Sequence, residues 1–322
     1  MILSRRSFAG GLAFGALALG GLVLGGRPRP GFSATATVRI GVQKYGTLII
    51  LRERRVLEAA LKPLGVEVSW HEFPGGPQLL EALSAGAIDF GATGEAPPIF
   101  AQAAGSPLVY VGVEPPSPKG EAILVLKDSP IHTLLDLRGK KIALNKGSNV
   151  HYFLVRALAS IGLKPADIVP VYLAPADARA AFGRGSVDAW VIWDPFLAAA
   201  QDATGARVLT DATGLAPNRQ FFVSTRAFAT AQPALLVQLN AQIDATDRWA
   251  ESNQAETVRL LAASMGLAEP VVAQAVARMG YGVQPLTPEI IADQQKIADT
   301  FFDLGLIPKK LDVANAVWRP EP

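Results

Sequence analysis

The chain has 322 residues, of which 50% are hydrophobic and 18% are charged, and it contains no cysteine. The apolar content is enough for substantial cores, and the lack of cysteine excludes disulfides, thiolate metal sites and a cysteine nucleophile. The net charge is +2, but residues 1–36 hold four arginines and no acid, so 26 Lys and Arg remain against 28 Asp and Glu. A net charge of about −2 excludes a basic surface of the kind that binds nucleic acid.

Residues 1–36 are typical of an export signal. Ser4-Arg5-Arg6-Ser7-Phe8 precedes an uncharged, glycine-rich run from Ala9 to Gly26, and Arg27 and Arg29 follow it. The paired arginines resemble twin-arginine signals, and Ala34-Thr35-Ala36 fits a small-x-small cleavage site, so we expect cleavage near Ala36. A retained membrane anchor is the alternative, because the run approaches the roughly 20 residues that span a bilayer.

From residue 38 to about residue 211, short apolar or β-branched runs alternate with helical stretches, a pattern typical of α/β architecture with largely parallel sheets. Strands are predicted at 38–43, 66–73, 88–92, 108–113, 121–127, 141–144, 168–173, 187–192 and 208–209. Helices are predicted between them at 49–61, 77–85, 97–104, 150–161, 175–182 and 195–200.

The order of these elements predicts two lobes. A strand at 220–228 is expected to return toward the first lobe, and 233–304 is expected to be helical with breaks at glycines and prolines. Crossings at 122–126 and 221–224 would form a two-segment hinge. We therefore expect lobe I at 37–121 and 222–322, lobe II at 122–221, and a ligand cleft where the strand ends of both lobes meet.

Three turns between a strand and a helix have a composition suited to an anion: Gln43-Lys44-Tyr45-Gly46-Thr47, Thr93-Gly94-Glu95-Ala96-Pro97 and Asn145-Lys146-Gly147-Ser148-Asn149. A helix N-terminus offers unpaired N–H groups, and glycine lets a ligand approach the backbone. The alternative is that Thr93, Ser148 and Asn149 only cap their own helices. Glu95 opposes an anion site unless it points away or pairs with a base such as Lys44 or Lys146.

Further segments make the pattern specific. They are Phe73-Pro74-Gly75-Gly76-Pro77-Gln78, the run from Thr93 to Gln102, Val111-Gly112-Val113-Glu114-Pro115-Pro116, Gly147-Ser148-Asn149-Val150-His151-Tyr152, the run from Pro175 to Phe182, and Trp193-Asp194-Pro195-Phe196. Together they closely resemble the aliphatic sulfonate-binding proteins of bacterial ABC importers. The resemblance runs from Val38 to Trp318.

The resemblance implies the type II periplasmic binding protein fold, with a mixed, mostly parallel sheet in each lobe, flanking helices and a helical C-terminal portion. It implies a binding protein, expected to be a monomer, that captures alkanesulfonates in the periplasm for sulfur acquisition. An inner-membrane ABC permease and its cytoplasmic ATPase would be its partners, and no catalytic residue, cofactor or metal is expected. The ligand contacts implied at matching positions are Gln43, Tyr45, Gly46, Gly94, Glu95, Ala96, Gly147, Ser148, Asn149, Trp193 and Asp194.

A sulfonate fits these turns because it is a monoanion with three acceptor oxygens and no proton to donate, so that neutral donors suffice. Tyr45 and Trp193 would cover its alkyl tail, and packing in a core is the alternative role for Trp193. The sequence departs from the family pattern at Lys44-Tyr45, Glu95 and Asn149. Taurine, an aromatic sulfonate, a sulfate ester, nitrate, bicarbonate or a thiamine precursor remain alternative ligands.

An enzyme of the same fold is the alternative from another class. The histidines are His71, His132 and His151, and neither a Gly-x-Ser-x-Gly elbow nor a His-Glu-x-x-His motif occurs. His71 and His132 are expected to have structural roles. A role in binding remains open for His151, because it lies in the first turn of its predicted helix, close to the cleft. It would either make a pH-dependent contact with the ligand or form a hydrogen bond near its own helix.

Overall fold

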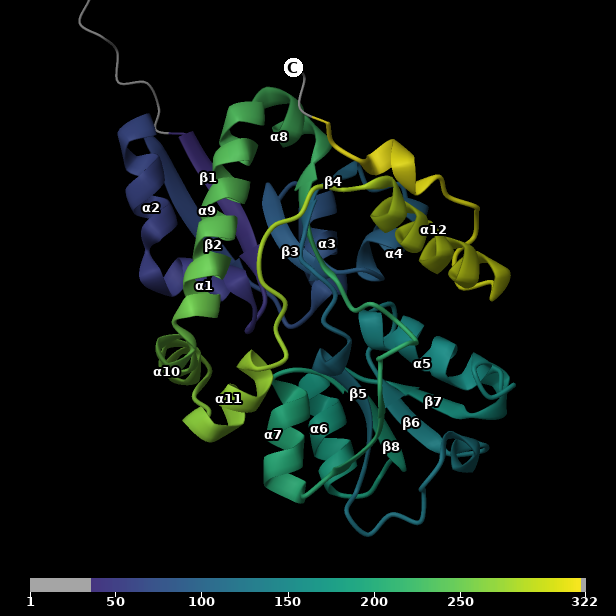
Figure 1. Cartoon of the computed structure of the whole chain (residues 1–322). Helices are drawn as coiled ribbons and strands as arrows, with labels where there is room; N and C mark the ends of the chain where they lie inside the picture. The colour runs from purple at the N-terminus through teal and green to yellow at the C-terminus, as the bar shows by residue number, and fades with distance from the viewer. Residues whose placement is uncertain (1–35, 320–322) are drawn as a thin grey trace, which may run out of the picture. The chain divides into compact units, whose positions relative to one another are not determined.

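The computed structural model describes residues 36–319, which are organised by two five-stranded sheets (Figure 1). The predicted signal peptide lies outside the described residues except for Ala36. The first sheet has the order β2-β1-β3-β10-β4, formed by Val66–Glu72, Ala36–Val42, Phe90–Gly94, Gln220–Thr225 and Leu108–Val113. β1 is parallel to β2 and β3, and β10 is antiparallel to β3 and β4, so four of the five strands share one direction.

The second sheet repeats this arrangement in the order β7-β6-β8-β5-β9, formed by Val169–Tyr172, Lys141–Leu144, Ala189–Trp193, Glu121–Val125 and Arg207–Asp211. β6 is parallel to β7 and β8, and β5 is antiparallel to β8 and β9. Every predicted strand overlaps one of these ten strands. The predicted fold class, two mixed and mostly parallel sheets flanked by helices, is confirmed.

Helices cover both faces of the first sheet (Figure 1). One face carries α1 (Thr47–Arg54), α2 (Val56–Leu61), α9 (Pro233–Ser252) and α10 (Gln254–Met265), and the other carries α3 (Gly76–Ser84), α4 (Pro97–Ala103) and α12 (Pro288–Asp303). In β4, Val109 and Val111 pack on the α9 side, whereas Leu108 and Tyr110 pack on the α12 side. This alternation is the period-two pattern of a strand buried on both faces.

The second sheet is covered in the same way. α5 (Asn149–Ala159) packs on the face that contains Ile142 and Leu144, and α6 (Pro175–Gly183) and α7 (Phe196–Thr204) pack on the face that contains Ala143 and Trp190. The remaining helices are α8 (Arg226–Ala231) and α11 (Glu269–Val276). Alanines on α7 pack against Val271 and Ala275 of α11, so the helical C-terminal portion contacts the second sheet's helices.

Two predicted elements are divided in the structure. The helix predicted at 49–61 is interrupted at Arg55, which adopts a left-handed conformation (φ 53°) between α1 and α2. The strand predicted at 220–228 ends at Thr225, whose hydroxyl accepts a hydrogen bond from the N–H of Phe228 (3.1 Å) and thereby caps α8. A threonine cap followed by an alanine-rich turn favours helix over strand at this point.

The predicted crossings at 122–126 and 221–224 are wrong, because those residues lie mainly within β5 and β10. The chain passes between the sheets at 114–120 and returns at 212–219. Pro115, Pro116 and Pro118 have no N–H to donate to a strand ladder, so the first connection forms no strand and ends in a short 3-10 helix, Pro118–Gly120. Below, these segments are named the first crossover (114–120) and the second crossover (212–219).

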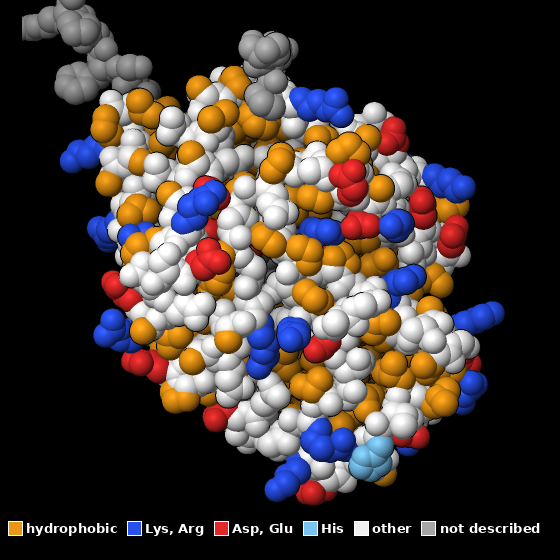
Figure 2. All heavy atoms as spheres, viewed as in Figure 1, with side chains coloured by type: hydrophobic (Ala, Val, Ile, Leu, Met, Phe, Trp, Pro, Cys, Tyr) orange, Lys and Arg blue, Asp and Glu red, His pale blue; other side chains and the backbone are white. Residues whose placement is uncertain are grey.

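The surface of the described part shows no strong separation of charge on the face in Figure 2, where acidic and basic side chains are interspersed. This agrees with the near-neutral charge of the chain after residue 36. No helix within residues 36–319 combines the length and the apolar character required to cross a membrane.

Candidate functional site

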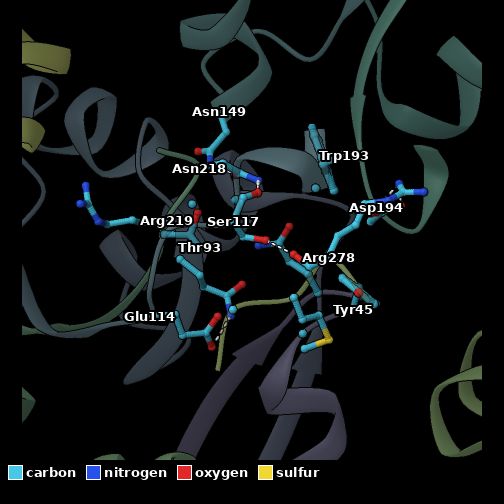
Figure 3. A pocket seen from close by; sticks show the side chains of 18 of the residues that line it. Tyr45, Thr93, Glu114, Ser117, Asn149, Trp193, Asp194, Asn218, Arg219 and Arg278 are labelled. Atoms are coloured by element: carbon cyan, nitrogen blue, oxygen red, sulfur yellow. Dashed lines mark hydrogen bonds and ion pairs between the residues drawn. The ribbon is translucent and has the colours of Figure 1, made fainter. Parts of the chain in front are cut away.

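A cleft of about 800 Å³, counted with its open mouth, lies where strand ends of both sheets meet. The first sheet contributes the turns after β1 and β3, and the second sheet contributes the N-terminus of α5 and the end of β8. Both crossovers and the segment after α11 complete its walls. Figure 3 shows Asn149 and Trp193 toward one end of the cleft and Glu114 and Tyr45 toward the other.

The structure brings most of the predicted contact residues together in this cleft. Those that line it are Gln43, Tyr45, Gly46, Gly94, Ser148, Asn149, Trp193 and Asp194. The other three, Glu95, Ala96 and Gly147, are not among its lining residues. A position in the wall of the cleft does not test contact with a ligand, so the role of each residue remains a prediction at this point.

The helices that start at the cleft are not capped by the side chains of their N-cap residues. Ser148 precedes α5, but its hydroxyl donates to the carbonyl of Asn145 (2.7 Å) instead of accepting from its own helix. The side chain of Asn149 accepts from the N–H of Ala96 (3.1 Å), on a different helix. The alternative that Thr93, Ser148 and Asn149 only cap their own helices is therefore wrong.

Two hydroxyl groups in the cleft have no protein partner within residues 36–319. The Oγ1 atom of Thr93 and the phenolic oxygen of Tyr45 are both buried without a hydrogen bond. Burial, reinforced by the nearby carboxylate of Asp194, raises the pKa of Tyr45, so that its hydroxyl keeps its proton. Because a buried polar group without a partner is costly, both hydroxyls are free to donate to a ligand.

An ion pair crosses the cleft between Asp194, after β8, and Arg278, after α11 (Figure 3). Arg278 donates to Oδ2 and Oδ1 of Asp194 at 3.0 and 3.2 Å, and the N–H of Ala198 also donates to Asp194 (3.2 Å). Burial nevertheless raises the pKa of Asp194 to about 6, although Arg278 and the hydrogen bonds oppose this shift. The predicted contact Asp194 is thus already paired with a cation from the other wall.

Glu95 points away from the cleft. This is one of the two arrangements in which, according to the sequence analysis, Glu95 would not oppose an anion site. Its carboxylate accepts hydrogen bonds from the backbone N–H groups of Asn218 (3.3 Å) and Arg219 (3.0 Å), so it anchors the second crossover. Burial raises its pKa to about 7. Pairing with Lys44 or Lys146 does not occur: Lys44 lies 3.9 Å from Glu72, and the Lys146 ammonium lies over the ring of Tyr172.

His151 forms a hydrogen bond next to its own helix. The N–H of Gly147 donates to its Nδ1 (3.2 Å), and its ring lies nearly parallel to Phe100, with centroids 6.5 Å apart. Burial, with a smaller contribution from Lys146, lowers the pKa of His151 to about 4, so the ring is neutral at pH 7. Since His151 does not line the cleft, the structure favours the structural interpretation.

Sequence reasoning did not single out several lining residues of the crossovers and of the segment after α11. They include Glu114, Ser117, Asn218, Arg219, Gln220, Arg278 and Met279. Arg219 donates to Asp293 (3.1 Å), while its Nε is buried without a partner in the described part of the chain. Only Glu114 had a sequence signal, because it lies in the family-like segment 111–116; the others depend on long-range packing.

Comparison with known proteins agrees with this site. Residues 62–255 match the NMT1/THI5 like family. An Escherichia coli (strain K12) relative, which carries the provisional name of an aliphatic sulfonates-binding protein, is 46% identical over 289 residues, 89% of this chain and 90% of its own.

Two solved structures are similar over most of the described residues. The alkanesulfonate-binding protein SsuA from Xanthomonas axonopodis pv. citri bound to MOPS has a TM-score of 0.86 and 45% identity, covering 88% of this chain and 99% of that one. The periplasmic aliphatic sulphonate binding protein SsuA from Escherichia coli has a TM-score of 0.81 and 46% identity, covering 88% and 92%. The desulfurization enzyme DSZB, at 16% identity and a TM-score of 0.65, shares the fold alone. The chain therefore belongs to the NMT1/THI5-like family and, within it, to the group of the aliphatic sulfonate-binding proteins.

Proposed function

We propose that this chain binds an organic sulfonate in its cleft and is the substrate-binding component of an ABC importer. The observation that carries the proposal is a set of free donors at the end of the cleft formed by β3 and α5: the hydroxyl of Thr93 has no protein partner within residues 36–319, and α5 begins there without a side-chain cap. A sulfonate accepts hydrogen bonds through three oxygens and donates none, so it matches these groups. Family membership supports the same ligand class.

The sulfonate head lies between the end of β3 and the N-terminus of α5 in this proposal. Thr93, Gly94, Ser148 and Asn149 contribute a hydroxyl, open backbone and helical N–H groups there. A Cβ atom at Gly94 would come within 2.1 Å of the Asn149 side chain, so only glycine leaves room at this point. Neutral donors at a helix N-terminus bind such a head without a proton transfer.

The remaining predicted residues receive roles according to their positions. Gln43, Tyr45, Gly46, Trp193 and Asp194 line the cleft and contact the rest of the ligand. Glu95, Ala96 and Gly147 act indirectly, since they hold the second crossover, Asn149 and His151 through hydrogen bonds. Trp193 is half-buried, with its ring edge-to-face with Phe196, and presents an apolar surface for an alkyl tail.

The two sheets belong to two lobes that move relative to each other in this proposal. Because β5 begins at Glu121 and β10 begins at Gln220, the expected boundaries at 121/122 and 221/222 move to the crossovers, so that 36–113 and 220–319 form one lobe and 121–211 form the other. The crossovers at 114–120 and 212–219 are the hinge. The Asp194–Arg278 pair spans the cleft, and α11 packs on α7 beside it, so domain closure would change both contacts.

The protein acts in the periplasm as a monomer, after export through a twin-arginine signal, and delivers its ligand to an inner-membrane permease driven by a cytoplasmic ATPase. Similarity to the periplasmic aliphatic sulphonate binding protein from Escherichia coli supports this location. Cell fractionation with and without Arg5→Lys/Arg6→Lys tests the export route. Light scattering tests the monomer.

A binding role without catalysis is the function that the site favours. His151, the one histidine near the cleft, is buried among Phe100, Tyr172 and Phe301 and bonded to Gly147. Turnover of a bound sulfonate that His151→Ala abolishes, with binding retained, would contradict this proposal.

Thermal unfolding of the purified protein with separate additions of alkanesulfonates, taurine, a sulfate ester, sulfate, nitrate and a thiamine precursor tests the ligand class. A ligand at about 100 times its dissociation constant adds about 2.7 kcal/mol, a shift of a few degrees in a chain of this size. We expect a shift with sulfonates and none with nitrate or sulfate. A shift with a sulfur-free ligand alone would contradict the assignment.

A further inference from the structure

Glu114 is a buried carboxyl group in the wall of the cleft, in the first crossover. Its side chain lines the cleft although the residue is only 6% exposed (Figure 3). Its Oε1 lies 3.0 Å from Oγ1 of Thr47, the first residue of α1, and 3.0 Å from Nε2 of Gln220, which donates to it. Its Oε2 accepts no hydrogen bond from any residue in the described range. One acceptor atom of Glu114 is thus left for the contents of the cleft.

A second carboxyl group is joined to Glu114 through Thr47. The same Oγ1 of Thr47 lies 2.5 Å from Oδ1 of Asp247 on α9. A threonine hydroxyl has a single proton, so it donates to only one of the two carboxyl groups. The other contact is a hydrogen bond only if that carboxyl group carries a proton and donates it to Oγ1. The geometry therefore places one shared proton on Glu114, Thr47 and Asp247.

The shared proton leaves this cluster with one negative charge and no cationic partner among the described residues. Asp247 accepts from the N–H of Gly282 (3.0 Å), and its neighbour Asp244 is paired with Arg248. The other titratable groups that act on the pair are Glu251 of α9 and the phenols of Tyr45 and Tyr281. The arginines of the cleft, Arg219 and Arg278, are paired with Asp293 and Asp194.

The free acceptor and the uncompensated charge indicate what the ligand carries at this end. A plain alkyl tail would leave Oε2 of Glu114 without a partner and the buried charge without a counter-ion, which is unfavourable. An ammonium group would supply both, and a hydroxyl would supply the hydrogen bond alone. Met279, also in this wall, provides an adaptable apolar surface beside the polar group.

We propose that Glu114 is a specificity-determining residue that accepts a hydrogen bond from the tail of the ligand, so that the cleft prefers sulfonates bearing an ammonium or hydroxyl group to unsubstituted alkanesulfonates. This inference rests on the proposed sulfonate function and deepens it. Thr47 and Asp247 are positioning residues, because they hold Glu114 and its proton without lining the cleft.

The shared proton gives the preference a pH dependence with a definite sign. Burial raises the pKa of both carboxyl groups, and that of Asp247 to about 7. When the pH rises through this value the cluster loses a proton and gains one negative charge. Binding of an aminoalkanesulfonate, whose amine is still cationic, becomes stronger, and binding of an unsubstituted alkanesulfonate becomes weaker.

Isothermal titration of the purified protein with matched pairs of ligands tests the proposal. Each pair consists of an ω-aminoalkanesulfonate of two to four carbons and the unsubstituted alkanesulfonate of the same length, with the ω-hydroxy compound as the neutral donor. At the length that reaches Glu114 we expect the amino compound to bind at least tenfold more tightly. Glu114→Gln should reduce this ratio to near one, and Glu67→Gln, the same charge change on the exposed face of β2, should leave it unchanged.

Asp247→Asn separates the preference for the amino compound from the pH dependence of that preference. An amide at position 247 donates to Thr47, so that Thr47 donates to an ionised Glu114. The preference should persist in this variant, but its change between pH 6 and pH 8 should disappear. If alkanesulfonates bind and no amino compound of any length is preferred, or if Glu114→Gln retains the preference, the inference is wrong and the proposed function stands. If neither kind of sulfonate binds the unaltered protein, the proposed function itself fails.

Discussion

The two sheets have the same strand order but use equivalent carboxyl groups in different ways. In each sheet the central strand, β3 or β8, is followed directly by a buried acid, Glu95 or Asp194. Glu95 turns away from the cleft and accepts two backbone N–H groups of the second crossover. Asp194 lines the cleft and is paired with Arg278.

The difference shows that the local sequence determines where each carboxyl group lies. The hydrogen-bond donor that binds the carboxyl group determines what the group does. Both acids follow a strand and lie close to a proline that begins or precedes a helix. Backbone donors hold Glu95 in one place and fix the connection between the sheets. A long side chain holds Asp194, so this contact can break and reform when the walls of the cleft separate.

Removal of the partner of Asp194 is the strongest test of this comparison. Arg278→Ala leaves a carboxylate that is 4% exposed without a cation, and we expect a loss of about 3 kcal/mol in the free energy of unfolding at pH 8. Urea unfolding measures it. The loss should be smaller at pH 5, where Asp194 takes up a proton.

The matched control adds Asp194→Asn to Arg278→Ala, which removes the unpaired charge together with its partner. Most of the lost stability should return in the double variant. Equal losses in the single and double variants would mean that Arg278 acts through packing, and the contrast with Glu95 would then fail.

Glu95→Gln tests the other carboxyl group through pH. Burial raises the pKa of Glu95 from 4.5 to about 7, so the folded chain retains a proton that the unfolded chain releases in this range. The stability contributed by this proton is full below pH 4.5, falls as the pH rises to about 7 and is constant above. The 2.5-unit difference corresponds to about 3 kcal/mol.

The amide in Glu95→Gln does not titrate, but it loses one of the two backbone hydrogen bonds. The variant should therefore be less stable than the unaltered chain at pH 5 and more stable at pH 8, as measured by chemical unfolding at both values. Glu67→Gln, on the surface, supplies the control. A difference between variant and unaltered chain that does not change with pH would contradict the burial argument.

The fold was predictable because its signals are local. Alternating apolar runs such as Leu108–Val113 mark strands, and prolines at 77, 97 and 175 mark helix starts; the structure has β4, α3, α4 and α6 at these places. The crossovers were misplaced by several residues. Apolar runs at 122–126 and 221–224 identified strands correctly, but which sheet each strand joins depends on pairing with β8, β9, β3 and β4, far away in the sequence.

The site was predictable in part for the same reason. The resemblance supplied eleven expected contacts, of which eight line the cleft, and six of these eight lie in the strand-to-helix turns that composition had already singled out. Arg219 and Arg278 were missed because no local motif surrounds them, and their partners Asp293 and Asp194 are 74 and 84 residues away. The resemblance placed Glu95 among the contacts, but its orientation depends on the second crossover, which no local pattern reports.

Thr93→Val is the smallest change and separates binding from stability. Thr93 occupies in β3 the place that Ile192 occupies in β8, but its buried Oγ1 has no protein partner in residues 36–319. Removal of a hydroxyl that bonds to nothing should leave the free energy of unfolding within about 0.5 kcal/mol of the unaltered chain. A hydrogen bond to a charged sulfonate is worth about 1.5 kcal/mol or more, so the affinity should fall at least about tenfold by titration calorimetry.

Ser148→Ala gives the contrast, since the Ser148 hydroxyl bonds to Asn145 and its loss costs about 1 kcal/mol of stability. Unchanged affinity in Thr93→Val would move the sulfonate head away from β3 and toward α5.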